Sequence, residues 1–194
     1  MSTQLMAAPV RAQMNRMLVA ALIATVAMLF TAFAASYMER AGARGWEKIA
    51  LPRILWLNTA VLLLSSVFAE VARRSRVRPF DAVQARSNVE GIAAAPKGMA
   101  RWALPLALLL GLLFLCGQAA AWGDLRARGL FLPTSPHASF IYLLTAVHAV
   151  HILAALLALV LALTRTRILG LAVGFWHFMG GVWLYVLLIL TVLG

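Results

Sequence analysis

Cysteine and acidic residues are scarce in this sequence of 194 residues. The single cysteine, Cys116, excludes an intrachain disulfide and a cysteine-based metal site. Only six acidic residues are present: Glu39, Glu47, Glu70, Asp81, Glu90 and Asp124. None of them falls near the centre of a long apolar segment, where proton relays and ion-coupled transporters carry ionisable groups. The scarcity therefore argues against both functions within this chain.

Hydrophobic residues, by contrast, make up 63% of the chain, while 17 lysines and arginines give a net charge of +11. An apolar composition of this kind is typical of a membrane protein. The basic residues flank the apolar segments and do not form a patch with interleaved aromatic residues. We therefore expect them to set the membrane topology and to contact anionic lipids, and we expect no nucleic-acid partner.

Five apolar segments are long enough to cross a bilayer, at residues 17–37, 54–72, 102–122, 140–163 and 168–193. Because a backbone in lipid must satisfy its own hydrogen bonds, we predict an all-α fold. It is one polytopic membrane domain, residues 1–194, with five transmembrane helices in a bundle. The longest connection, residues 73–101, is expected at the inner membrane surface. Within it, Asp81 and Gln84 fit a capping box and Gly91 a helix end, which predicts a short helix.

The distribution of basic residues predicts the orientation of the bundle. Eleven of the 17 lysines and arginines lie on the same side as the N-terminus, and six lie on the other side. Basic residues are enriched on the cytoplasmic side of membrane proteins. The prediction is therefore an N-terminus inside and a C-terminus outside.

Histidines are the most conspicuous polar residues of the predicted spans. The stretch "TAVHAVHILAAL" holds His148 and His151, which lie about 60° apart on one helix face and so cannot ligate the same haem iron from opposite sides. His177 in the last span could partner one of them, because counting along the spans places it at a depth similar to that of His148. We favour instead that these three histidines face the bundle interior and form interhelical hydrogen bonds, typically worth about 0.6 kcal/mol each. His137 is expected near the outer surface, in solvent.

The second span carries further polar residues. Asn58 and Ser65 are seven residues apart and so share a helix face, with Ser66 beside them. Nearer the inner end, Glu70 is placed to pair with Arg73 and Arg74, three and four residues on.

Two tryptophans of the last span, Trp176 and Trp183, admit two interpretations: contacts with lipid headgroups, or packing in the bundle interior. Glycines at Gly170, Gly174 and Gly181 share one side of the same span. Small residues there would let a neighbouring helix or a lipid chain approach closely.

Five motifs, one for each span, resemble subunit III of the haem-copper oxidases in its five-helix bacterial form. They are "FTAFAASYMERAG", "LPRILWLNTAVLLLSS", "LGLLFLCGQAAAW", "SFIYLLTAVHAVHILAAL" and "GFWHFMGGVWLYVLL". Each motif alone is weak. Together they cover all five spans in the family's order and with compatible spacing.

The resemblance implies a non-catalytic subunit of a respiratory oxidase in the bacterial inner (cytoplasmic) membrane, more often a cytochrome c oxidase than a quinol oxidase. Such a subunit packs on subunit I, which holds the haem and copper, and it holds no cofactor of its own. It binds phospholipid, supports proton uptake and protects the enzyme during turnover. Other oxidase subunits or a respiratory supercomplex are further implied partners. The lipid and packing candidates are then Asn58, Ser65, Ser66, His148, His151, Trp176, His177 and Trp183.

The chain also departs from the family's pattern. Val26 stands where the first helix usually carries a buried glutamate, and Gly180 stands where the last helix usually carries an acid. These departures weaken any role of the chain's own acids in moving protons. They leave open one alternative, a subunit III-like accessory protein of nitric oxide reductase or another respiratory complex. The histidines leave open a second, a membrane b-type cytochrome whose haem is held by His177 with His148 or His151.

Overall fold

The computed structural model of the chain describes residues 2–42, 46, 49–76, 97–132 and 136–193. The helices are α1 (Ser2–Ala41), α2 (Ile54–Arg76), α4 (Lys97–Ala127), α5 (Pro136–Thr164) and α6 (Leu169–Leu193), with a short 3₁₀ turn, η1 (Thr166–Ile168), before α6. Within these described ranges, five helices are long and apolar enough to span a membrane. For the described residues, the predicted all-α fold with five helices of spanning length is therefore confirmed. The short helix predicted from Asp81 lies outside the described residues.

The helices extend beyond the apolar segments from which they were predicted. At the end of α4, Arg128 binds Asp124 at 2.6 Å. The helix ends at Ala127, and two residues later Gly129 has a φ of 78°. Leu130 N–H donates to the Leu125 carbonyl and Gly129 N–H to the Arg126 carbonyl, which is the hydrogen-bond pattern of a Schellman C-cap. Polar residues thus continue α4 past the apolar segment until a glycine in the left-handed conformation stops it.

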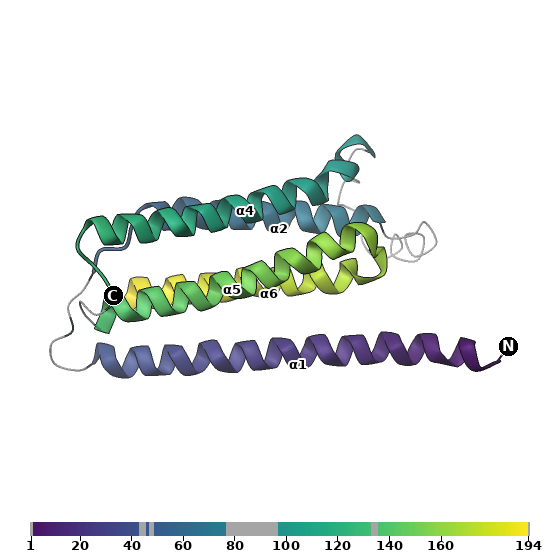
Figure 1. Ribbon diagram of the computed structural model, residues 1–194, viewed down its shortest axis with the longest axis horizontal. Coiled ribbons are helices and arrows are strands. Elements are labelled where there is room, and N and C mark those ends of the chain that lie inside the picture. Colours follow the sequence, from purple (N-terminus) through teal and green to yellow (C-terminus); the bar gives the residue numbers. More distant parts are fainter. Residues whose placement is uncertain (1, 43–45, 47–48, 77–96, 133–135, 194) are drawn as a thin grey trace, which may run out of the picture.

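The five helices form an antiparallel bundle in which α6 is central. Figure 1 shows α2 beside α4, α5 beside α6, and α1 on the far side of α5 and α6. Helix α6 packs against α1, α2 and α5. Accordingly, 56% of its most apolar stretch is buried, against 17% for α1. The two termini lie at opposite ends of the bundle, as an odd number of spans requires (Figure 1).

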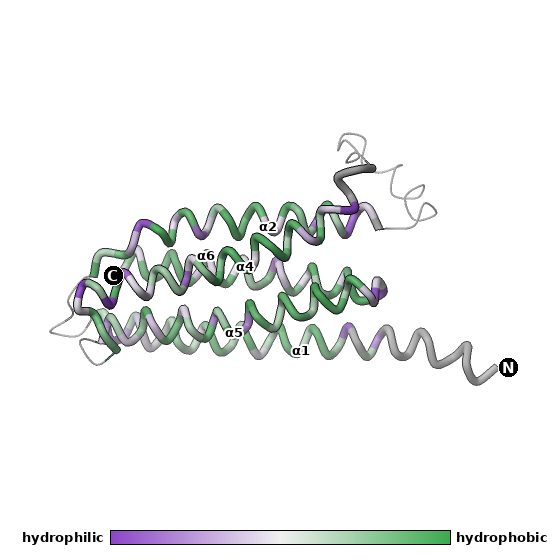
Figure 2. The backbone as a smooth tube through the Cα atoms, turned by 45° about the horizontal axis from the view of Figure 1, so that its top comes forward, coloured by the Kyte–Doolittle hydropathy of each residue, from purple (hydrophilic) through white to green (hydrophobic). Residues whose placement is uncertain are grey.

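The two ends of the bundle differ in chemistry, and we name them after residues found there. The Arg73 end holds the end of α2 and the beginning of α6, and the His137 end holds the end of α1 and the beginning of α5. Figure 2 shows hydrophilic residues gathered toward both ends, with predominantly hydrophobic helices between them. Which end faces the cytoplasm stays a prediction.

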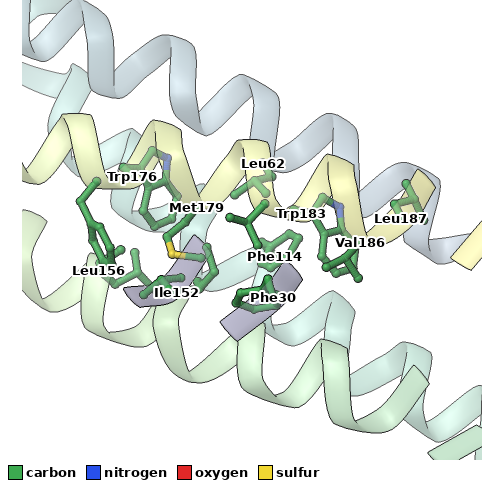
Figure 3. Packing of buried hydrophobic residues seen from close by; sticks show 14 of the residues in the cluster. Phe30, Leu62, Phe114, Ile152, Leu156, Trp176, Met179, Trp183, Val186 and Leu187 are labelled. Carbon is green, nitrogen blue, oxygen red and sulfur yellow. The ribbon is translucent and has the colours of Figure 1, made fainter. Parts of the chain in front are cut away.

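Large aromatic side chains fill the middle of the bundle (Figure 3). Phe30 of α1, Phe114 of α4, and Trp176 and Trp183 of α6 are all almost completely buried. They come from helices on opposite sides of the bundle. Since lipid is as apolar as leucine, such close packing has to hold the helices together where the hydrophobic effect does not.

Candidate functional site

Two polar side chains of α2 tie this helix to α4. Asn58 Nδ2 donates to the Phe114 carbonyl at 2.9 Å, and Ser65 Oγ donates to the Ala107 carbonyl at 2.8 Å. Both side chains are buried. Their seven-residue spacing places them on one face of α2, as the sequence indicated, and that face meets α4. Each bond satisfies a polar group that would be costly to leave unpaired in hydrocarbon.

Glycine at position 117 lets α4 approach α2 closely. A Cβ atom built on Gly117 would lie 2.1 Å from Asn58 Oδ1 and 2.7 Å from Asn58 Cγ. The Asn58 side chain cannot easily move away, because its amide nitrogen is bonded to the Phe114 carbonyl. The contact between α2 and α4 at this level therefore depends on the absence of a side chain at residue 117.

The two tryptophans of α6 pack in the interior. Trp176 is 0% and Trp183 is 1% exposed, so of the two interpretations the structure favours interior packing over headgroup contact. Trp183 Nε1 donates to Thr59 Oγ1 at 2.9 Å, and Thr59 donates in turn to the Leu55 carbonyl. This chain of two bonds ties α6 to α2 at the same level as Asn58.

His148 lies in an aromatic cage in the middle of the bundle. Its ring centroid lies 6.1 Å from that of Phe30, 5.9 Å from Phe114 and 5.2 Å from Trp183. The side chain is 0% exposed. Neither ring nitrogen has a hydrogen-bond partner within the described part of the chain. The prediction that His148 faces the interior is right, but the predicted interhelical hydrogen bond is wrong.

His151 also differs from its prediction. Its Nδ1 lies 2.7 Å from the carbonyl oxygen of Val147, four residues earlier on the same helix. The ring packs edge-on against Phe30 at 5.9 Å, so this histidine contacts α1 through its ring. The only hydrogen bond found for His151 among the described residues is within α5 and not between helices.

At the Arg73 end, the predicted ion pair is present and is larger than predicted. Arg73 donates through Nε and Nη2 to the two oxygens of Glu70, at 2.8 and 2.6 Å, and Arg74 Nε donates to Oε1 at 2.7 Å. His177 of α6 joins them, with Nε2 3.5 Å from Glu70 Oε2, but its side chain is 40% exposed, so the prediction that it faces the interior is wrong. The spacing within α2 predicted the arginines. The histidine comes from the last helix, and only the packing of α2 against α6 brings it there.

His177 and His148 do not meet, contrary to the depth estimate made from the sequence. His148 lies 16 residues before the end of α5 and His177 eight residues after the start of α6, so roughly 24 and 12 Å of helix separate them from the Arg73 end. Trp183, which contacts His148, is six residues beyond His177 and points about 120° away from it. The helices extend past the apolar segments, so residue counts along those segments do not give the relative depth of the two histidines.

His137 is the clearest correction. It was expected in solvent, yet it is 1% exposed. Its Nδ1 accepts from the Ile49 N–H at 3.2 Å, and its Nε2 lies 3.1 Å from the Tyr37 hydroxyl oxygen. The ring stacks on Trp46 at 4.7 Å between centroids. Trp46 and Ile49, which precede α2, thus cover His137 and shield it from solvent.

Three further polar residues of the interior were not singled out from the sequence. Trp122 Nε1 donates to Thr145 Oγ1 at 2.9 Å, which ties α4 to α5. Gln118, one turn before Trp122, is 2% exposed. The spacing of four residues in "GQAAAW" places Gln118 and Trp122 on one face, and that signal could have found them.

The two positions where the family usually carries an acid lie inside the bundle. Val26 is buried one turn before Phe30, whose ring contacts both His148 and His151. A Cβ atom built on Gly180 would lie 3.6 Å from Ser66 Oγ, so residue 180 faces α2. Among the described residues, no three or more His, Cys, Asp or Glu side chains converge as a metal site would require.

Fold and site together define a polytopic α-helical membrane protein whose polar side chains tie its helices to one another. No family model matches the chain. It is similar to a probable cytochrome c oxidase subunit 3 of Mycobacterium tuberculosis, with 32% identity over 108 residues, which are 48% of this chain and 53% of the relative. The match thus spans about half the length of that relative.

Two other relatives match over more of their length. The probable cytochrome c oxidase subunit 3 of Nocardia farcinica is 26% identical over 170 residues, 70% of this chain and 83% of the relative. The cytochrome c oxidase subunit 3 of Corynebacterium diphtheriae is 29% identical over 172 residues, 81% and 74% respectively. These relatives, at 26–32% identity, support the haem-copper oxidase subunit III family that the five motifs of the sequence resemble.

Proposed function

We propose that this chain is the non-catalytic subunit III of a respiratory haem-copper oxidase, a cytochrome c oxidase in the first instance. The observation that carries the proposal is its similarity to relatives named cytochrome c oxidase subunit 3, over a chain that folds as five membrane-spanning helices. In this proposal the haem and copper belong to partner subunits. The chain supplies a scaffold that packs on subunit I and binds phospholipid.

The outward side of α6 supports packing against a partner helix. Gly170, Gly174 and Gly181 lie on the exposed side of this helix, whose other side is buried in the bundle. A Cβ atom built on any of the three meets nothing within 4 Å. Small residues on an open helix face let another transmembrane helix or an acyl chain approach the backbone closely. The central helix of the bundle therefore offers a surface suited to a partner.

The remaining parts of the proposal concern the membrane and protons. The bundle lies in the bacterial inner membrane with its N-terminus inside, because basic residues are concentrated at the Arg73 end. Support of proton uptake and of stability during turnover acts through contact with subunit I. It does not use acids at residues 26 and 180, where this chain has valine and glycine.

Co-purification tests the proposal. The tagged full-length chain is produced in a host that makes the complete oxidase, extracted in mild detergent and analysed by intact mass and by reduced-minus-oxidised spectroscopy. We expect one copy of the chain for each haem-containing subunit I. Capture of nitric oxide reductase subunits instead would favour the accessory-protein alternative. A stoichiometric haem spectrum from the chain purified alone would overturn the proposal in favour of a cytochrome.

A matched pair of variants tests whether the glycine side of α6 is the surface that contacts subunit I. Gly174→Leu fills the open face of α6, and Gly123→Leu makes the same change on α4, where a Cβ atom also meets nothing within 4 Å. We expect Gly174→Leu to lower the yield of co-purified subunit I several-fold, and Gly123→Leu to leave it unchanged. Equal yields from both variants would exclude this face of α6 as the contact.

A further inference from the structure

Gln118 lies in the middle layer of the bundle, and its amide group has no hydrogen-bond partner in the described part of the chain. Its side chain is 2% exposed. Neither Nε2 nor Oε1 is hydrogen-bonded to any described residue. On α4 it lies between Phe114 and Trp122, one helical turn from each. All three residues therefore share the face of α4 that contacts α5.

The same layer of α5 holds His148. Phe114 packs against His148 at 5.9 Å, and Trp122 binds Thr145, one turn before His148. The two helices are antiparallel neighbours. Gln118 therefore faces the stretch of α5 between Thr145 and His148. Thr145 is already engaged, because it also donates to the Ile141 carbonyl, so His148 is the unpartnered group opposite Gln118.

By this placement, one buried layer holds four polar atoms that have no partner among the described residues: both amide atoms of Gln118 and both ring nitrogens of His148. A buried amide or imidazole that forms no hydrogen bond destabilises the folded protein, because its polar atoms have lost their water partners. The aromatic rings around His148 offer no conventional donor or acceptor that is free, since the Trp183 N–H is bonded to Thr59. Backbone groups of the surrounding helices are engaged within their own helices. A small polar ligand that both donates and accepts hydrogen bonds would therefore satisfy these atoms.

We propose that Gln118 and His148 together bind an internal water between α4 and α5. A water molecule donates two hydrogen bonds and accepts two, and buried waters typically make about three to otherwise unsatisfied polar groups. A direct bond between Gln118 and His148 would engage one atom of each and leave the other two unpaired. A bound water can form hydrogen bonds with more of the four atoms than the direct bond can. It also links α4 to α5 one turn from the Trp122–Thr145 bond.

Water-edited solid-state NMR of the full chain in phospholipid vesicles tests the site. With ¹⁵N in the histidine rings, the chain's four histidines serve as references for one another. His137 is 1% exposed, so its rate of transfer from water protons is the reference for a buried ring. The His177 side chain is 40% exposed, so its rate is the reference for a hydrated ring. We expect water protons to reach His148 far faster than His137, although His148 is 0% exposed.

Two variants distinguish a water bound by Gln118 and His148 from water that reaches the interior without Gln118. In Gln118→Leu the water signal of His148 is expected to fall to the level of His137. Asn58→Leu removes a different buried amide of the same region and is expected to leave the His148 signal unchanged. A His148 signal as low as that of His137 in the unmodified chain would overturn the proposal. So would a signal that survives Gln118→Leu, or a direct Gln118–His148 coupling without water transfer.

Discussion

Two histidines of α5, His137 and His148, are equally buried and yet have opposite surroundings. His137 is 1% and His148 is 0% exposed. Both ring nitrogens of His137 lie within hydrogen-bonding distance of Tyr37 and the Ile49 backbone, whereas neither ring nitrogen of His148 has a partner among the described residues. Burial alone therefore does not define what a histidine does in this bundle.

The difference follows from what each ring faces. His137 lies at the end of the bundle, where the non-helical residue Ile49 donates its backbone N–H to the ring. Because a backbone N–H can only donate, Nδ1 of His137 accepts, and in the neutral ring Nε2 then carries the proton toward Tyr37. His148 lies opposite regular helices, whose backbone groups are already bonded. Only side chains or bound molecules remain for it.

The largest loss of stability is expected when the hydrogen bonds of His137 are removed. His137→Leu leaves the Ile49 N–H and the Tyr37 hydroxyl without their partner and removes the stacking on Trp46. We expect a loss of about 3 kcal/mol in the free energy of unfolding, measured by reversible denaturation in mixed micelles. Tyr37→Phe, which removes one bond only, is the control and should cost about 1 kcal/mol. A loss for His137→Leu no larger than that of the control would show that the backbone bond contributes nothing.

The next largest loss of stability is expected where α4 approaches α2 closely, at Gly117 and Asn58. Gly117→Ala places a methyl group where Asn58 Oδ1 lies 2.1 Å away, so one of the two must move. We expect a loss of about 2 kcal/mol from overpacking in the same assay. Adding Asn58→Ala makes room for the methyl group, so the double variant should be more stable than the two separate losses predict. Strict additivity would mean that the two residues do not collide.

His148 itself should be less sensitive than His137. His148→Leu breaks no hydrogen bond to any described residue, although it leaves Gln118 without the ring opposite it. We expect a loss of about 1 kcal/mol, and little or no further loss when Gln118→Leu is added, because paired polar groups replaced together cost little. If His148→Leu cost as much as His137→Leu, the contrast between the two histidines would be wrong.

The smallest effect tests how the aromatic cage of His148 is fixed. Thr59→Val removes the hydroxyl that accepts from Trp183 Nε1 but keeps the shape of the side chain. Interhelical bonds of this kind are worth about 0.6 kcal/mol on average, so a loss of that size is expected in the unfolding assay. Trp183 fluorescence should shift at the same time, since the indole N–H loses its partner. An unchanged spectrum with unchanged stability would show that ring packing alone positions Trp183.

Particular residues show how far the sequence could predict the site. The spacing of Asn58 and Ser65 placed both on one face of α2, and the spacing of Glu70, Arg73 and Arg74 predicted their ion pair, because both patterns lie within one helix. His177 was assigned the wrong depth and His137 the wrong environment. Both errors concern the register of one segment against another, and no spacing within a helix records that register.

The sequence by itself determined the number of spans and their approximate bounds, because a backbone in hydrocarbon must form helices and twenty or so apolar residues are needed to cross. The motifs of those spans also pointed to the subunit III family. Only the tertiary structure decided which helix is central, which histidine meets Glu70 and which is left among aromatic rings. The physical reason is that lipid and protein interior are equally apolar, so hydrophobicity does not mark the inward face. Close packing and a few hydrogen bonds choose it, and these depend on residues far apart in the chain.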